Sequence, residues 1–175
     1  GTADEVYKTE LLMKQAKVTE EDRPVVAAAL DKAQEAGDTA AAMMLQDGRI
    51  ITGRTSDLLG ASSAMLLNAL KALGGIQDDI HLISPIIIEP IQQLKTQHLG
   101  NNNPRLHTDE VLIALSICAA TNPTAALALS QLPKLKDTEA HSTVILSSVD
   151  ETTLRKLGVN LTCEPKYYTK GLYHK

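Results

Sequence analysis

Large aromatic side chains are almost absent from this chain. Its 175 residues include four tyrosines but no phenylalanine and no tryptophan. Hydrophobic residues still make up 43% of the sequence, so we expect a core of aliphatic side chains and methionine. Single-stranded nucleic acids are usually bound on aromatic side chains that stack with the bases. The composition therefore disfavours that class of function.

A basic patch is also missing from the sequence. The formal net charge is −4, whereas binding to a phosphate backbone needs clustered lysine and arginine. The mildly basic end of the chain, residues 166–175, is interpreted as a solvated terminus. We expect no nucleic-acid partner.

Cysteines and long apolar runs are scarce as well. Cys118 and Cys163 are the only cysteines, and they lie outside any CxxC pattern, which favours free thiols over a disulfide. No apolar run approaches the roughly 18 residues of a membrane span, and the first residues carry no secretion signal. These absences predict a soluble, cytoplasmic protein with no membrane partner.

What the sequence does contain is an alternation of helical and extended patterns. A helical stripe covers residues 4–16, and a helix capped at Thr19 is expected to end at Gly37. Two strands, 39–45 and 49–55, flank an Asp-Gly pair typical of a β-hairpin. Further helices are predicted at 60–73, 86–97, 108–121, 122–132 and 149–157, and further strands at 80–84, 141–147 and 159–164.

This order of elements predicts an α/β fold. After the hairpin each strand alternates with helix, which favours right-handed crossovers and a mostly parallel sheet. The expected product is a three-layer α/β/α sandwich around a five-stranded mixed sheet. Residues 1–18 are assigned to an N-terminal helical extension that leads toward a missing N-terminal domain, and residues 19–175 to the α/β domain.

The predicted order resembles the cytidine-deaminase-like fold. The resemblance is carried by residues 47–53, which lead into the helix at 61–73, and by Ser84-Pro85 before the next helix. In deaminases those two helix starts supply a His or Cys, a Glu that moves protons, and a Cys-x-x-Cys pair around zinc. The resemblance implies the same scaffold for residues 19–175.

The zinc ligands of that family do not occur at the matching positions. Those positions are occupied by Ala64, Leu66, Ile86 and Glu89. Ala, Leu and Ile cannot ligate a metal, and one Glu cannot hold zinc alone. We therefore expect no metal, no cofactor and no zinc-dependent deaminase activity.

Several strings along the whole chain resemble a second, closer family. They are residues 4–7 (DEVY), 55–61 (TSDLLGA), 103–110 (NPRLHTDE), 139–146 (EAHSTVIL) and 158–165 (GVNLTCEP). They are similar to the C-terminal part of a bacterial family, domain-of-unknown-function family 1846. The resemblance implies a larger protein in which a nucleotide-binding-like domain precedes this one. It carries over no catalytic residues, so whether the protein is an enzyme stays open.

Two groups of polar residues stand where predicted helices begin, at the expected carboxyl edge of the sheet. Free amides at such ends favour an anion, but Ser, Thr and Asp are also ordinary capping residues. The groups are Thr55, Ser56, Asp57, Ser62 and Ser63 at one helix and Ser84 at another. We interpret both as caps first and as ligand-binding residues second.

Two further candidates involve histidine. Arg105, His107 and Asp109 follow an Asn-rich loop; a His-x-Asp pair suits a base and its orienting acid, and Arg105 suits a clamp for carboxylate or phosphate. Asp109 as a cap and Arg105 as a surface residue fit equally well. His141 begins a largely apolar strand and is interpreted first as a hydrogen-bonded core residue.

Two hypotheses about function follow. The first is a non-catalytic regulatory or assembly domain, which packs on the missing N-terminal domain and on copies of itself. It rests on the helices at 108–121 and 122–132, which are apolar nearly all round. The alternative is one wall of an interdomain active or ligand site, which supplies Arg105, His107 or the helix end at Ser62-Ser63 to a substrate held by the missing nucleotide-binding-like domain. The polar groups at this edge suit a small anionic ligand.

Overall fold

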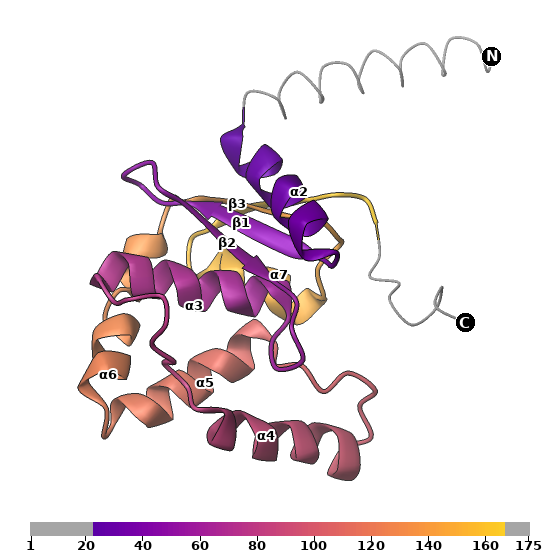
Figure 1. The fold of residues 1–175 in the computed structure, drawn as a ribbon, viewed down its shortest axis with the longest axis vertical. Helices are drawn as coiled ribbons and strands as arrows, with labels where there is room; N and C mark the ends of the chain where they lie inside the picture. The colour runs from indigo at the N-terminus through magenta and orange to yellow at the C-terminus, as the bar shows by residue number, and fades with distance from the viewer. Residues whose placement is uncertain (1–22, 167–175) are drawn as a thin grey trace, which may run out of the picture.

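The fold is built on an open sheet of four strands in the order β2-β1-β3-β4 (Figure 1). The computed structural model describes residues 23–166, so the extension predicted at 1–18 lies outside the described residues. The strands are Ala40–Met44 (β1), Ile50–Arg54 (β2), Glu139–Ser142 (β3) and Asn160–Cys163 (β4). β1 pairs antiparallel with β2 and with β3, whereas β3 and β4 are parallel. The α/β class and the mixed sheet are confirmed.

The predicted hairpin is present between β1 and β2. Gly48 has a φ of 90°, which an L side chain rarely adopts. The Asp47 carboxylate accepts a hydrogen bond from the Arg49 amide at 3.0 Å and pairs with the Arg49 guanidinium at 2.8 Å. Turn chemistry within three residues therefore sets the register that places Met44 opposite Ile50.

Helices cover both faces of the sheet. Helix α2 (Pro24–Ala36) packs Val25, Val26 and Ala29 against Ala42 of β1, and it ends at Gly37 as predicted. Helices α3 (Ala61–Gly74) and α7 (Ser148–Lys156) lie on the opposite face (Figure 1). These elements form the expected α/β/α layers.

A further tier of helices lies beyond α3. It consists of α4 (Pro85–Gln93), which continues as a π-helical turn η1 (Leu94–His98), then α5 (Thr108–Ala119), α6 (Pro123–Leu129) and the short 3-10 helix η2 (Leu132–Leu135). Helices α5 and α6 pack on each other and on α3. The Asn122 side chain caps α6 as predicted, by accepting from the amides of Thr124 and Ala125.

Two predictions about the sheet are wrong. Residues 80–84 form no strand; they are a loop whose Leu82 and Ile83 are buried in the core, so their apolarity reflects burial alone. The sheet of the described residues therefore has four strands instead of five. Two of its three pairings are antiparallel, so a mostly parallel sheet with deaminase-like topology is not supported.

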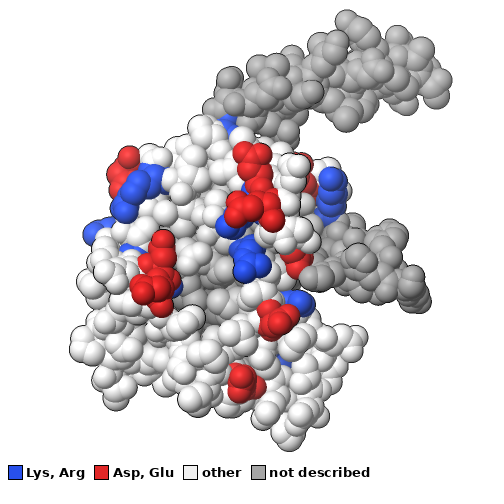
Figure 2. All heavy atoms as spheres, viewed as in Figure 1, with Lys and Arg blue, Asp and Glu red and all other residues white. Residues whose placement is uncertain are grey.

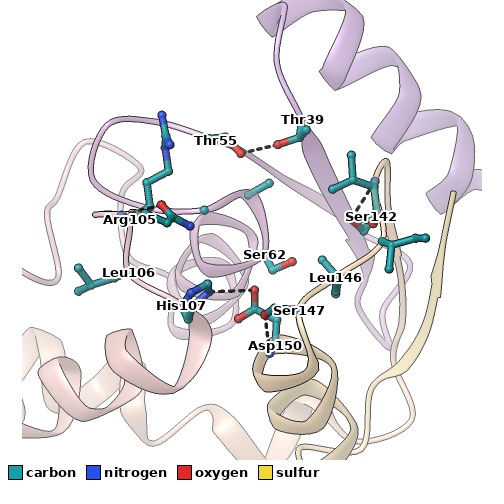
Figure 3. Close-up of a pocket in the computed structure, with 15 residues that line it drawn as sticks. Thr39, Thr55, Ser62, Arg105, Leu106, His107, Ser142, Leu146, Ser147 and Asp150 are labelled. Carbon is teal, nitrogen blue, oxygen red and sulfur yellow. Dashed lines mark hydrogen bonds and ion pairs between the residues drawn. The ribbon is translucent and has the colours of Figure 1, made fainter. Parts of the chain in front are cut away.

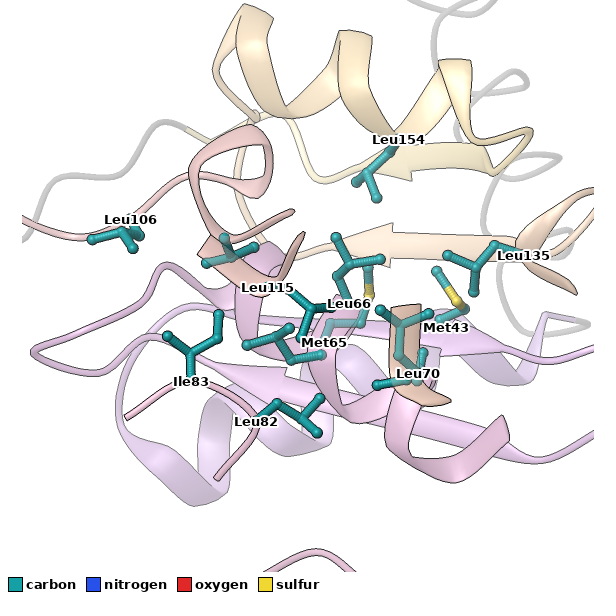
Figure 4. Close-up of a cluster of buried hydrophobic side chains, with 14 of the residues drawn as sticks. Met43, Met65, Leu66, Leu70, Leu82, Ile83, Leu106, Leu115, Leu135 and Leu154 are labelled. Carbon is teal, nitrogen blue, oxygen red and sulfur yellow. The ribbon is translucent and has the colours of Figure 1, made fainter. Parts of the chain in front are cut away.

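The core between the sheet and α3 is aliphatic, as the composition predicts (Figure 4). Its largest fully buried side chains belong to Met and Leu: Met43, Met65, Leu66, Leu70, Leu106, Leu115, Leu135 and Leu154. No Phe, Tyr or Trp occurs between residues 23 and 166. Packing in this core therefore depends on flexible and branched aliphatic side chains instead of rings.

The surface combines interspersed charges with exposed apolar side chains. On the face in Figure 2, acidic and basic residues alternate over the sheet and α3, whereas the region of α4–α6 is mainly uncharged. Ile86 of α4 and Ile113 and Ile117 of α5 are 79%, 61% and 65% exposed. Helix α5, which is apolar nearly all round, is therefore buried on one side and exposed on the other. Within residues 23–166, no helix has the length and apolarity needed to cross a bilayer.

The packing of α3 on β2 generates the first testable prediction. A Cβ at Gly53 would lie 2.1 Å from the Met65 nitrogen and 2.7 Å from the Ala61 carbonyl oxygen, both backbone atoms of α3. Gly53→Ala must push the helix off the sheet, so we expect a loss of at least about 3 kcal/mol in the free energy of unfolding, the upper end of the usual cost of overpacking.

Urea denaturation measures this loss, with Gly74→Ala as the control. Gly74 lies in the last turn of α3, and its nearest neighbour is the end of the flexible Ile76 side chain at 3.3 Å. That substitution should change stability by less than about 1 kcal/mol. Equal stability of Gly53→Ala and the native protein would contradict the close contact.

Candidate functional site

A pocket of about 160 Å³ lies where three helices begin. Its lining comes from the start of α3 (60–62), the loop before α5 (103–107) and the segment from β3 into α7 (142–147), with Thr39, Thr55 and Asp150 completing it. The α5 N-cap is His107 and the α7 N-cap is Ser147. Helix starts present free amides and partial positive charge, so each of the three must find an acceptor.

The start of α5 finds its acceptors within the protein. One carboxylate oxygen of Asp150 accepts from the Thr108 amide at 2.9 Å and from the Thr108 hydroxyl at 2.7 Å. The Glu110 carboxylate accepts from the His107 amide at 2.8 Å. This helix start is therefore closed by two acids.

The side chains of His107 and Asp150 face each other inside the pocket (Figure 3). Nδ1 of His107 lies 3.6 Å from the second carboxylate oxygen of Asp150. The Asp150 carboxylate raises the pKa of His107 above its ordinary value, although partial burial and the Lys95 charge oppose the rise. Burial acts strongly to raise the pKa of Asp150, but His107 and the bonds from Thr108 outweigh it and hold that pKa low. The pair is favoured as imidazolium and carboxylate.

The start of α7 is also capped internally. The Ser147 hydroxyl accepts from the amide of Asp150 at 3.3 Å, and Asp150 and Glu151 provide negative charge in the first turn. Of the three helix starts at the pocket, two thus have at least one amide bonded by a side chain and carry acids in the first turn.

The start of α3 is the exception. Its N-cap is Gly60, which has no side chain, and its first turn holds no acid. In the part of the chain that the structure describes, the amides of Ala61, Ser62 and Ser63 donate to no acceptor. The Ser62 hydroxyl is also without a hydrogen-bond partner there, although Ser62 is only 3% exposed. Figure 3 shows this hydroxyl pointing into the pocket.

Arg105 lies at the rim of the pocket, on the loop before α5. Its Nε donates to the Ser56 carbonyl at 2.5 Å, which leaves its two terminal nitrogens without a partner among residues 23–166. The buried Lys95 donates to the Arg105 carbonyl at 2.5 Å and to the Glu110 carboxylate at 2.7 Å. An ion pair between the buried Lys95 and the partly buried Glu110 therefore supports the loop that carries Arg105 and His107.

The structure brings four of the predicted site residues together. Thr55, Ser62, Arg105 and His107 all line the pocket. The Thr55 hydroxyl shares a 2.5 Å hydrogen bond with the hydroxyl of Thr39. The candidate anion site at the start of α3 and the Arg-His loop are thus one site, which the sequence suggested only as an option.

The other predicted site residues lie elsewhere or serve local structure. Ser56 and Asp57 are exposed, and the Ser56 hydroxyl accepts from the amides of Leu58 and Leu59. Ser63 donates to the Leu106 carbonyl at 2.8 Å, Ser84 caps α4, and the Asp109 carboxylate accepts from the Glu110 amide. His141 is buried on β3, where Nδ1 lies 2.8 Å from the Thr162 hydroxyl and Nε2 lies 3.5 Å from the Glu164 carboxylate.

Sequence reasoning missed Asp150, Ser147, Ser142 and Thr39. A signal existed for two of them, because Ser147 followed three residues later by Asp150 is a typical helix-start pattern. We assigned residues 141–147 to a strand and therefore did not recognise Ser147 as a helix cap. In the structure β3 ends at Ser142. Among the described residues 23–166, no three or more His, Cys, Asp or Glu side chains gather in a group able to hold a metal.

The fold and the pocket define an α/β domain with an uncapped helix start in a cavity of mixed polar and aliphatic lining. Comparison with known proteins places it in a family. The model "Domain of unknown function DUF1846, C-terminal" matches residues 21–173, and the chain belongs to this family.

Two relatives of the chain are longer proteins. It is 58% identical to a UPF0371 protein of Corynebacterium efficiens over 94% of its own length and 33% of the relative's. It is 51% identical to a UPF0371 protein of Streptococcus thermophilus over 97% of its own length and 34% of the relative's. The chain thus spans about a third of the curated relatives it matches.

The His107–Asp150 contact generates a prediction about pH. Asp150→Asn removes the charge and keeps the shape of the side chain, so the pKa of His107, followed by NMR of its ring, should fall relative to the native protein. A histidine with a raised folded pKa stabilises the fold below its ordinary pKa, and that stabilisation is lost as pH rises through the folded value. The stability deficit of Asp150→Asn should therefore be larger at about pH 5.5 than at about pH 8, on either side of the ordinary pKa of about 6.5.

His107→Gln provides the control for this prediction. It should remove the pH dependence of the difference, since no imidazole then titrates beside Asp150. An unchanged His107 pKa in Asp150→Asn would show that the contact does not govern the histidine.

Proposed function

We propose that this domain binds a small anionic ligand, one that carries a phosphate or carboxylate group, in the pocket at the start of α3. The observation that carries the proposal is the contrast among the three helix starts. Those of α5 and α7 have acceptors from Asp150, Glu110 and Ser147. The start of α3 has none, and a buried hydroxyl without a partner stands beside it.

The chemistry of the pocket suits an oxyanion. Up to three amides, the Ser62 hydroxyl and the partial positive charge of the helix start act as donors at one place. The free guanidinium nitrogens of Arg105 add a charged donor at the rim. The Asp150 carboxylate also lines the pocket, but it already accepts two hydrogen bonds from Thr108 and lies against His107, which partly compensates its charge.

Ligand binding is favoured over covalent catalysis in this domain. A serine nucleophile requires a base within hydrogen-bonding distance, and among residues 23–166 the Ser62 hydroxyl has no such partner. The role that fits best is regulatory: the domain responds to an anion within a longer protein. A contribution of this pocket to a site shared with another domain is the alternative, and both roles require the anion to bind here.

Two substitutions test the proposal by calorimetric titration with inorganic phosphate. Ser62→Ala removes one neutral donor, so affinity should fall roughly 2- to 12-fold. Arg105→Ala removes a charged donor and should weaken binding roughly 10- to 150-fold. Lower ionic strength strengthens the contribution of the partly exposed Arg105.

Ser84→Ala is the matched control. It also removes a serine hydroxyl at a helix start, but Ser84 caps α4 and lies outside the pocket. Its phosphate affinity should equal that of the native protein. If Arg105→Ala lowers the melting temperature severely and leaves affinity per folded molecule intact, Arg105 is structural and the assigned role is wrong.

We also propose that the domain self-associates through α5. Ile113 and Ile117 lie one turn apart on its exposed side, whereas Val111, Ala114 and Leu115 are buried on the other. Two isoleucines exposed to water do not stabilise a monomer, but the same side of α5 in a second copy of the domain would bury them.

Analytical ultracentrifugation tests this second proposal. The native domain should sediment as a dimer or larger species at high micromolar concentration, and Ile113→Lys with Ile117→Lys should return it to the monomer. As a control, Leu30→Lys changes an exposed leucine on α2 and should leave association unchanged. A strictly monomeric native domain would refute assembly through α5.

A further inference from the structure

One wall of the anion pocket is apolar. It is formed by Val144, Ile145 and Leu146, which lie in the segment between β3 and α7 and are each partly buried. Figure 3 shows Leu146 on the side of the pocket toward which the Ser62 hydroxyl points. The pocket thus has a polar end at the start of α3 and an aliphatic side.

The backbone of this wall is held in place by its own hydrogen bonds. The Thr143 amide donates to the Ala40 carbonyl at 3.0 Å, and the Ile145 amide donates to the Lys166 carbonyl at 2.5 Å. The Ser142 hydroxyl donates to the Val144 carbonyl at 2.7 Å. Because these groups are already paired, the wall presents side chains to a ligand and few hydrogen-bonding groups.

The described residues 23–166 offer no aromatic ring on which a nucleobase could stack. No Phe, Tyr or Trp occurs between residues 23 and 166, and base recognition commonly uses aromatic faces. A sugar would bring hydroxyl groups against the aliphatic wall, where burying them without partners is costly. Nucleotides and sugar phosphates therefore fit this pocket poorly.

We infer that the ligand is an anion with a short aliphatic body. Its head group lies at the start of α3 beside the Ser62 hydroxyl, and its hydrocarbon part lies against Val144, Ile145 and Leu146. A short-chain carboxylate and an alkyl phosphate share this chemistry. The inference rests on the proposed anion site and adds the class of molecule that the site selects.

A titration series in chain length tests the inference. Inorganic phosphate is compared with methyl, ethyl and butyl phosphate, and acetate with butyrate and hexanoate, by calorimetry at one pH and one salt concentration. Each added methylene that reaches the wall should tighten binding about fourfold. The two arms distinguish a phosphate head from a carboxylate head. Glucose 6-phosphate and AMP should bind more weakly than butyl phosphate.

Substitutions in the apolar wall should reduce the gain in affinity with the chain length of the ligand. Val144→Thr and Leu146→Asn should remove most of the gain with chain length and leave the affinity for inorganic phosphate within about twofold. Val144→Thr keeps the shape of the side chain, so it serves if Leu146→Asn does not fold. Val149→Thr is the matched control, because Val149 is exposed on α7 outside the pocket, and its series should match the native one.

The outcomes separate this inference from the proposed function. Phosphate binding with no dependence on chain length, or tighter binding of AMP than of butyl phosphate, would overturn the aliphatic ligand and leave the anion site standing. Binding of no anion in either arm would overturn both. A steep series in the native protein that Val144→Thr abolishes would support both.

Discussion

The Asp150 carboxylate is the interaction on which the geometry of the pocket depends. It lies in the first turn of α7, yet its oxygens accept from the amide and hydroxyl of Thr108 at the start of α5 and lie against His107. A single partly buried acid therefore links two helices and raises the pKa of the histidine between them. Removing its charge would affect the helix start, the histidine pKa and the shape of the cavity together.

This arrangement explains why the start of α3 differs from its neighbours. The acids near the pocket lie in the first turns of α5 and α7. Helix α3 has Gly60 as its N-cap and no acid in its first turn. Helix starts in proteins are normally satisfied by caps, water or ligands. An uncapped start next to the buried hydroxyl of Ser62 is what a site for an external anion requires. The aliphatic segment Val144–Leu146 limits which anions suit it.

Local signals in the sequence predicted local structure well, and long-range pairing less well. The Asp47-Gly48 turn, the helix end at Gly37 and the Asn122 cap depend on neighbours within a few residues, and all three are present. The apolar run at Leu82 and Ile83 was misread as a strand, because burial in a loop and burial in a sheet leave the same composition. The antiparallel pairing of β1 with β3 joins segments about a hundred residues apart. The periodicity of hydrophobic residues within a strand does not indicate which other strand it pairs with. For the site, residue types alone indicated Ser62, Arg105 and His107. The sequence suggested Asp109 as the acid beside His107, but in the structure that acid is Asp150, 43 residues further along the chain.

The position of a bound oxyanion tests the central claim most directly. A crystal of the domain soaked in selenate, a tetrahedral oxyanion with an anomalous signal, locates the ion without assuming a ligand. The account predicts a peak within hydrogen-bonding distance of the Ser62 hydroxyl and the first-turn amides of α3, with a guanidinium nitrogen of Arg105 turned toward it. Selenate bound only at other surfaces, with the start of α3 still solvated by water, would contradict it.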